Sequence, residues 1–105
     1  MNRQQQIDAF LLAAHRLGLA RLREAPERIE QVRAQLARWR QASGPTRSDA
    51  YWDEWERLLQ AGPDELERVL CDSGEHATLL RSVSPMSPLL TQRERSELLR
   101  EARAA

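Results

Sequence analysis

Apolar residues recur at intervals of three or four along most of the chain, which is the spacing of one face of an α-helix. Over residues 4–24 the apolar positions are Ile7, Phe10, Leu11, Ala14, Leu17 and Leu22. Over residues 26–42 the positions that follow the a and d spacing of a heptad are Ile29, Val32, Leu36 and Trp39. No stretch alternates apolar and polar residues as a half-buried strand would. The pattern therefore predicts an all-α fold.

Glycine and proline divide this pattern into segments. Pro26, Gly44-Pro45, Gly62-Pro63 and the turn at residues 84–88 mark the breaks. Ser48 is a favoured N-cap for a helix over residues 49–61, whose apolar face carries Trp52, Trp55, Leu58 and Leu59. Shorter helices are expected over residues 63–71 and 73–83, and a last one carrying Leu98 and Leu99. Asp72 with Glu75, and Thr91 with Glu94, have the spacing of capping boxes.

These segments predict five or six helices in a single domain over residues 1–105. Residues 1–44 should form an arginine-rich helical hairpin, and residues 48–105 an acidic bundle of short helices. The length of 105 residues, with 41% hydrophobic and 30% charged residues, fits one small globular domain. A lone cysteine, Cys71, cannot form an internal disulfide. Neither a signal peptide nor an apolar run of about 20 residues is present, so a cytoplasmic location is expected.

Charge is divided unevenly between the two halves, although the net charge is zero. Residues 1–47 hold nine arginines and four acids, whereas residues 48–105 hold seven arginines and twelve acids. Segment 49–75 alone has nine acids and two arginines. A concentrated negative surface attracts a basic protein and repels phosphate. The residues expected to bind such a partner are Asp53, Glu54, Glu56, Asp64, Glu65 and Glu67; the alternative is that they pair with the arginines of the first half.

Other functional classes have weaker support in the sequence. Nucleic-acid binding would use arginines of the second helix, namely Arg33, Arg38 and Arg40, but no helix-turn-helix pattern and no excess of positive charge accompanies them. Cys71 and His76 lie close in sequence without the nucleophile elbow or oxyanion loop of a catalytic site. One cysteine and two histidines do not make a zinc site. We therefore expect no enzyme, no metal and no cofactor. Whether the tryptophans are core residues or interface anchors stays open.

The second half of the chain resembles a group of short helical bacterial proteins. The motifs are Trp55-x-x-Leu58-Leu59, Gly62-Pro63, Val69-Leu70, Leu79-x-Arg81, Ser84-Pro85, Leu89-Leu90 and Arg93-Glu94-Arg95. Across residues 51–103 they are similar to proteins of mobile-element and toxin–antitoxin-type loci. The resemblance implies an accessory or antitoxin-like role. Together with the acidic segment it suggests a non-catalytic module that covers a basic protein partner. The apolar seam of the hairpin is also compatible with a homodimer.

Overall fold

The computed structural model describes all 105 residues and contains only helices. Six α-helices follow one another: α1 (Arg3–Glu24), α2 (Ile29–Ser43), α3 (Asp49–Ala61), α4 (Pro63–Leu70), α5 (Glu75–Ser82) and α6 (Gln92–Ala104). Two single turns of 3-10 helix connect some of them, η1 (Pro26–Arg28) and η2 (Ser87–Leu89). The predicted all-α class is confirmed. None of the helices combines the length and the apolarity that crossing a membrane requires.

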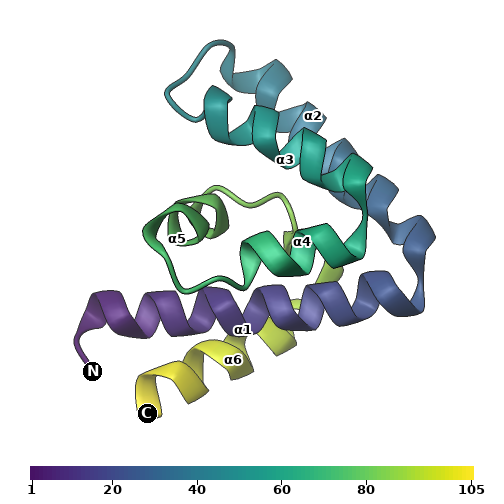
Figure 1. Ribbon diagram of the computed structural model, residues 1–105. Coiled ribbons are helices and arrows are strands. Elements are labelled where there is room, and N and C mark those ends of the chain that lie inside the picture. Colours follow the sequence, from purple (N-terminus) through teal and green to yellow (C-terminus); the bar gives the residue numbers. More distant parts are fainter.

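The long helix α1 packs against α4, α5 and α6, whereas α2 and α3 extend away from it (Figure 1). Helix α6 runs along one side of α1 and α4 packs on another side, while α2 pairs with α3. The two N-terminal helices diverge as a V from the turn at η1, so the predicted hairpin is an open one (Figure 1). Each of its helices packs mainly against later parts of the chain: α1 against α6 and α4, and α2 against η2 and α3. The N-terminal half therefore completes its packing only with elements from the C-terminal half.

One cluster of thirteen buried apolar residues joins helices α1 to α5 and the η2 segment. Trp55 is fully buried within it, and Trp52 is 9% exposed. Both indole N–H groups donate to backbone carbonyls near the end of α5, Trp55 to Leu80 at 3.0 Å and Trp52 to Val83 at 3.1 Å. Two tryptophans of α3 are thus core residues with their polar atoms satisfied.

Within α1 the buried face differs somewhat from the expected one. Leu19 is buried at 1% exposure although it lies outside the predicted face, whereas Ile7 is 38% exposed. Gly18 lies where the η2 segment approaches most closely, since a Cβ atom there would come within 2.8 Å of the Met86 methyl group. Gly18 therefore lets the flexible Met86 side chain pack closely against α1.

Helix ends follow the glycine and proline breaks, but their capping is mixed. Gly62 ends α3 with a φ of 103°, a value that other residues rarely adopt. Thr91 and Glu94 form the predicted capping box of α6. The capping box predicted for Asp72 and Glu75 is wrong, because the Asp72 carboxylate accepts a bond from the Gly74 N–H and α5 begins only at Glu75. Ser48 precedes α3 as predicted, yet its hydroxyl makes no capping bond.

A polar clasp holds α6 against α1. The guanidinium of Arg21 forms an ion pair with Glu94 and also donates to the Leu89 carbonyl at 2.8 Å. Glu94 at the same time caps Thr91, whose N–H lies 2.8 Å from the carboxylate. The hydrogen bond from Arg21, aided by the Thr91 N–H, lowers the pKa of Glu94 to about 2. One carboxylate thus both starts α6 and ties it to α1.

Candidate functional site

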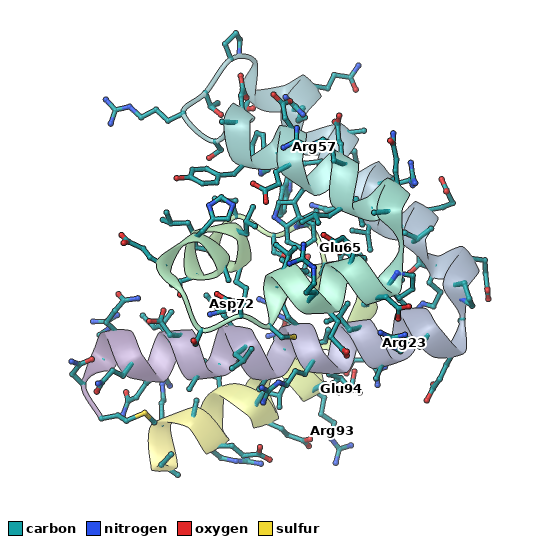
Figure 2. All side chains as sticks on the ribbon, in the orientation of Figure 1. Arg23, Arg57, Glu65, Asp72, Arg93 and Glu94 are labelled. Atoms are coloured by element: carbon teal, nitrogen blue, oxygen red, sulfur yellow. The ribbon has the colours of Figure 1, made fainter.

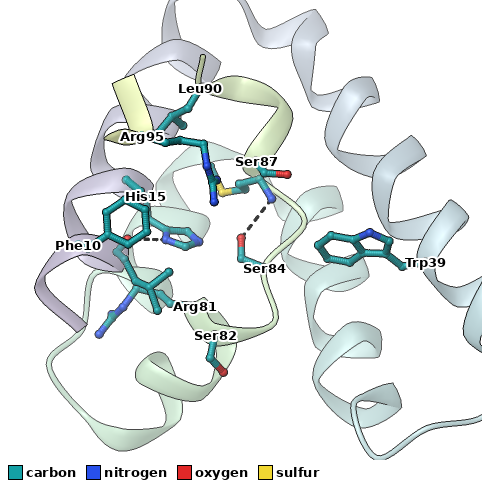
Figure 3. Close-up of a pocket in the computed structure, with 12 residues that line it drawn as sticks. Phe10, His15, Trp39, Arg81, Ser82, Ser84, Ser87, Leu90 and Arg95 are labelled. Carbon is teal, nitrogen blue, oxygen red and sulfur yellow. Dashed lines mark hydrogen bonds between the residues drawn. The ribbon is translucent and has the colours of Figure 1, made fainter. Parts of the chain in front are cut away.

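A cavity of about 250 Å³ lies between α1, α2 and the segment that joins α5 to α6 (Figure 3). Helix α1 contributes one face of its central turns, α2 contributes Trp39 near its end, and α6 contributes Arg95. The end of α5 adds Arg81 and Ser82, and the connecting segment adds both hydroxyl and apolar side chains, namely Ser84, Met86, Ser87 and Leu90. Half of the twelve lining residues are hydrophobic, and none is acidic. The cavity therefore combines apolar walls with positive charge.

His15 is the buried polar group on the α1 side of the cavity. Leu11 and His15 lie one turn apart on the same face of α1, so the His15 side chain lies next to the Leu11 carbonyl. The imidazole Nδ1 lies 2.7 Å from the Leu11 carbonyl oxygen, which can only accept, so Nδ1 carries the proton and Nε2 is left as an acceptor. The buried Nε2 atom has no hydrogen-bond partner. Burial, with a smaller contribution from the charge of Arg81, lowers the pKa of His15 to about 4.

Arg81 forms part of the cavity wall, but its guanidinium is used elsewhere. The side chain is 5% exposed, and its Nη1 donates to the carbonyls of Leu70 and Asp72, at the end of α4. Nη2 donates to the Thr78 hydroxyl at 3.3 Å. A cation at a helix C-terminus stabilises carbonyls that have no partner within the helix. Arg81 therefore fixes the turn between α4 and α5.

Arg95 differs from Arg81 because its guanidinium makes neither an ion pair nor a hydrogen bond within the chain. Its guanidinium carbon lies 5.9 Å from the centre of the Phe10 ring, a cation–π distance. Figure 3 shows the guanidinium of Arg95 and the imidazole of His15 pointing into the same part of the cavity, beside Ser84 and across from Trp39. No hydrogen bond joins His15 to a serine, the contact on which a hydroxyl nucleophile would depend. The arrangement offers binding groups for a small molecule.

The six acidic residues expected to bind a partner are all near basic groups of the same chain. Asp53 and Glu56 of α3 share Arg40 of α2, at 2.7 and 3.0 Å. Asp64 and Glu67 of α4 share Arg23 of α1, at 2.9 and 3.6 Å. Figure 2 labels Arg23 near the end of α1. We call these two groups the Arg40 cluster and the Arg23 cluster. In each cluster one guanidinium pairs with two carboxylates, so each cluster as a whole keeps a net negative charge.

The other two acids have partners of different kinds. Glu65 pairs with Arg68 one turn further along α4, and this hydrogen-bonded pair lowers the pKa of Glu65. Glu54 accepts a bond from His76 of α5, with Oε1 2.7 Å from Nε2. His76 thus faces a carboxylate of α3, and no hydrogen bond links it to Cys71. Pairing within the chain was the alternative foreseen from the sequence, and it occurs together with considerable exposure: Asp64 is 95% exposed and Glu67 57%.

The three arginines considered for nucleic-acid binding lie along α2 with different partners. Arg40 is held by Asp53 and Glu56, and hydrogen bonds to Asp53 raise its pKa. Arg33 donates to the Leu59 carbonyl at 3.3 Å and lies 3.5 Å from Glu30. Arg38 is exposed and bonds only to Gln35. The structure does not bring the three guanidinium groups together as one unpaired basic surface.

Sequence reasoning missed the cavity residues because they come from five parts of the chain: α1, α2, α5, the segment after α5, and α6. His15, Arg95 and the serines of the α5–α6 segment have no spacing that marks them as neighbours. The only local signal is His15 itself, a titratable residue one turn after Leu11 on the apolar face of a helix. No three His, Cys, Asp or Glu side chains are close enough to hold a metal ion. No protein-family model matches the chain, and no curated protein or solved structure is detectably similar to it.

Proposed function

We propose that this protein is a small non-catalytic module that binds a basic protein through the acidic surfaces of α3 and α4. The observation that carries the proposal is the charge that remains after pairing within the chain. Segment 49–75 has nine acids, and its two own arginines together with Arg23 and Arg40 supply only four guanidinium groups. Exposed carboxylates that share one cation are partly satisfied and still attract an arginine-rich surface.

The exposure of these carboxylates supports a docking role over a purely internal one. Ion pairs between exposed side chains contribute little to stability, generally about 0–1 kcal/mol. The Arg40 and Arg23 clusters leave their acids more than half exposed, at 54–56% in the first and 57–95% in the second. The resemblance of residues 51–103 to proteins of toxin–antitoxin-type loci is the reason for proposing an antitoxin-like or operon-partner role.

The test neutralises one acid from each cluster and leaves the other acid with its arginine. Asp53→Asn with Glu67→Gln removes two negative charges while Arg40 keeps Glu56 and Arg23 keeps Asp64. The matched control, Glu27→Gln with Glu101→Gln, removes the same charge at two exposed positions outside the clusters. Tagged proteins capture partners from extracts of the native host, and the association rate with the purified partner is then measured at low and high salt.

We expect the cluster variant to associate several times more slowly than the control at low salt, with the difference shrinking as salt screens the charges. Equal rates for the two variants would contradict the proposal. Retention of nucleic acid that Arg33→Gln with Arg38→Gln abolishes would replace it with a nucleic-acid-binding function.

A further inference from the structure

We propose that the cavity between α1, α2 and the α5–α6 segment binds a small aromatic carboxylate that also carries a hydroxyl group. This site is independent of the acidic clusters and has the opposite charge. Its assignment rests on three features of the cavity: a guanidinium without an anion, an acceptor without a donor, and walls that include two aromatic rings.

The first feature is the charge of Arg95. Ten of the sixteen arginines have no carboxylate within ion-pair distance, and Arg95, which is only partly exposed, is one of the two among them that line the cavity. Arg81, the other arginine at the cavity, uses Nη1 for the carbonyls of Leu70 and Asp72 and Nη2 for the Thr78 hydroxyl, which leaves only its Nε without a partner. Because no acidic side chain lines the cavity, an incoming anion meets no opposing charge there. A guanidinium binds a carboxylate through two parallel N–H···O bonds.

The second feature is the unpartnered Nε2 of His15. Buried polar atoms without a partner are uncommon in folded proteins, and a bound water, ion or other molecule is one explanation for them. The chain has three such atoms, His15 Nε2, Arg33 Nε and Arg81 Nε. Since Nδ1 donates to Leu11, Nε2 can only accept, and it points to the part of the cavity that Arg95 also faces (Figure 3). Because Nε2 is itself covered by neighbouring side chains, a hydroxyl group on the ligand would donate to it once those side chains move aside. A ligand that matches both Arg95 and His15 therefore carries a carboxylate and a hydrogen-bond donor on the same molecule.

The third feature is the shape and chemistry of the remaining wall. Phe10 and Trp39 contribute aromatic rings, and Met86 and Leu90 contribute flexible apolar side chains. A volume of about 250 Å³ accommodates a single ring with two small substituents. A phosphate group would need more than one free guanidinium for its three oxygens, and the apolar wall would oppose it. These limits favour a carboxylate on a flat ring.

The test uses three probes that differ in one group each: 3-hydroxybenzoate, 3-hydroxybenzamide, which lacks the charge, and benzoate, which lacks the hydroxyl. Binding is followed on the full chain by ¹H–¹⁵N NMR, with the indole N–H of Trp39 as a reporter at the cavity. The Arg95→Gln variant removes the proposed carboxylate partner. The Arg93→Gln variant is its control, because Arg93 lies two residues away on α6, is 88% exposed and is outside the cavity.

We expect saturable shifts at the cavity with 3-hydroxybenzoate and binding about tenfold weaker for 3-hydroxybenzamide or for Arg95→Gln, which corresponds to about 1.4 kcal/mol. Arg93→Gln should bind like the wild type, and benzoate should bind about fivefold more weakly than 3-hydroxybenzoate. Absence of saturable shifts at the cavity, or equal binding of acid and amide, would overturn the site. Equal binding of benzoate and 3-hydroxybenzoate would overturn the role of His15.

Discussion

Trp55 and His15 lie side by side in the protein, with ring centres 6.1 Å apart. The polar atom of Trp55 has a hydrogen-bond partner, whereas one of the two nitrogens of His15 has none. On the α3–α5 side, the Trp55 indole donates to Leu80 and that of Trp52 to Val83. On the α1 side, one imidazole nitrogen of His15 finds no partner. The carbonyl oxygens near the end of α5 can accept from donors such as an indole N–H. An acceptor such as Nε2 needs a donor instead, and none reaches it. The polar atoms around Trp52 and Trp55 are thus satisfied within the chain, whereas the Nε2 atom of His15 is left for the proposed ligand.

Replacing a tryptophan on each side tests this contrast most strongly. Trp55→Ala should lower the free energy of unfolding by about 3–5 kcal/mol, because it empties the centre of the core and removes the bond to Leu80. Trp39→Ala should cost about 1 kcal/mol, since Trp39 is half-buried at the cavity wall. Chemical denaturation followed by circular dichroism measures both. Equal losses would show that the cavity wall is packed as tightly as the core.

The pH dependence of stability provides a second test, on the imidazole itself. The pKa of His15 is about 4 in the folded protein, below the value of 6.5 in the unfolded chain. Above pH 6.5 the His15 ring is neutral in both the folded and the unfolded state. Between pH 6.5 and about 4 it is protonated in the unfolded chain but stays neutral in the folded protein. Stability should therefore fall by about 3 kcal/mol between pH 7 and pH 4 on account of His15. Denaturation midpoints across this range measure the slope.

The variants for this test are His15→Leu and His76→Gln. His15→Leu should remove most of the slope between pH 6.5 and 4, whereas His76→Gln, which changes an exposed histidine, should keep it. A wild-type slope that survives in His15→Leu would mean that the buried imidazole is protonated in the folded protein.

How far the sequence predicts this molecule depends on the range of the interaction. Gly62 and Pro63 end one helix and begin the next through local geometry, so the element order could be predicted. The capping box of Thr91 and Glu94 was predicted correctly, because both of its partners lie within one turn of the chain. Asp72 has the same spacing to Glu75 but bonds to Gly74, since a short polar side chain can close a local turn as readily as it caps a helix.

The candidate sites depended on tertiary packing and were harder to foresee. The acids of α3 and α4 were visible as a composition bias, but the sharing of Arg23 and Arg40 between two carboxylates each follows from how α1 and α2 pack. The cavity was not foreseen at all. Phe10 and Arg95 are separated by most of the chain, and no local rule relates a ring on the first helix to a guanidinium on the last.

The smallest expected effect comes from replacing the N-cap residues of α6 and α3, Thr91 and Ser48, which look alike in sequence. Thr91→Ala should cost about 1 kcal/mol, because the hydroxyl accepts the Glu94 N–H and completes the box. Ser48→Ala should cost close to nothing, since the Ser48 hydroxyl caps no N–H of α3. Thermal unfolding of both variants is the measurement. A larger loss for Ser48→Ala would reverse the assignment of the caps.

The clasp between Arg21 and Glu94 has a consequence for the order in which the protein can fold during synthesis. The two residues are 73 positions apart, so α1 has emerged from the ribosome long before α6 exists. Until then the side of α1 that α6 covers has no partner within the nascent chain. Domains fold as units, and loops of this length close late. The side of α1 that α6 covers is thus packed only late in synthesis, and a chain stalled before residue 92 leaves that side exposed.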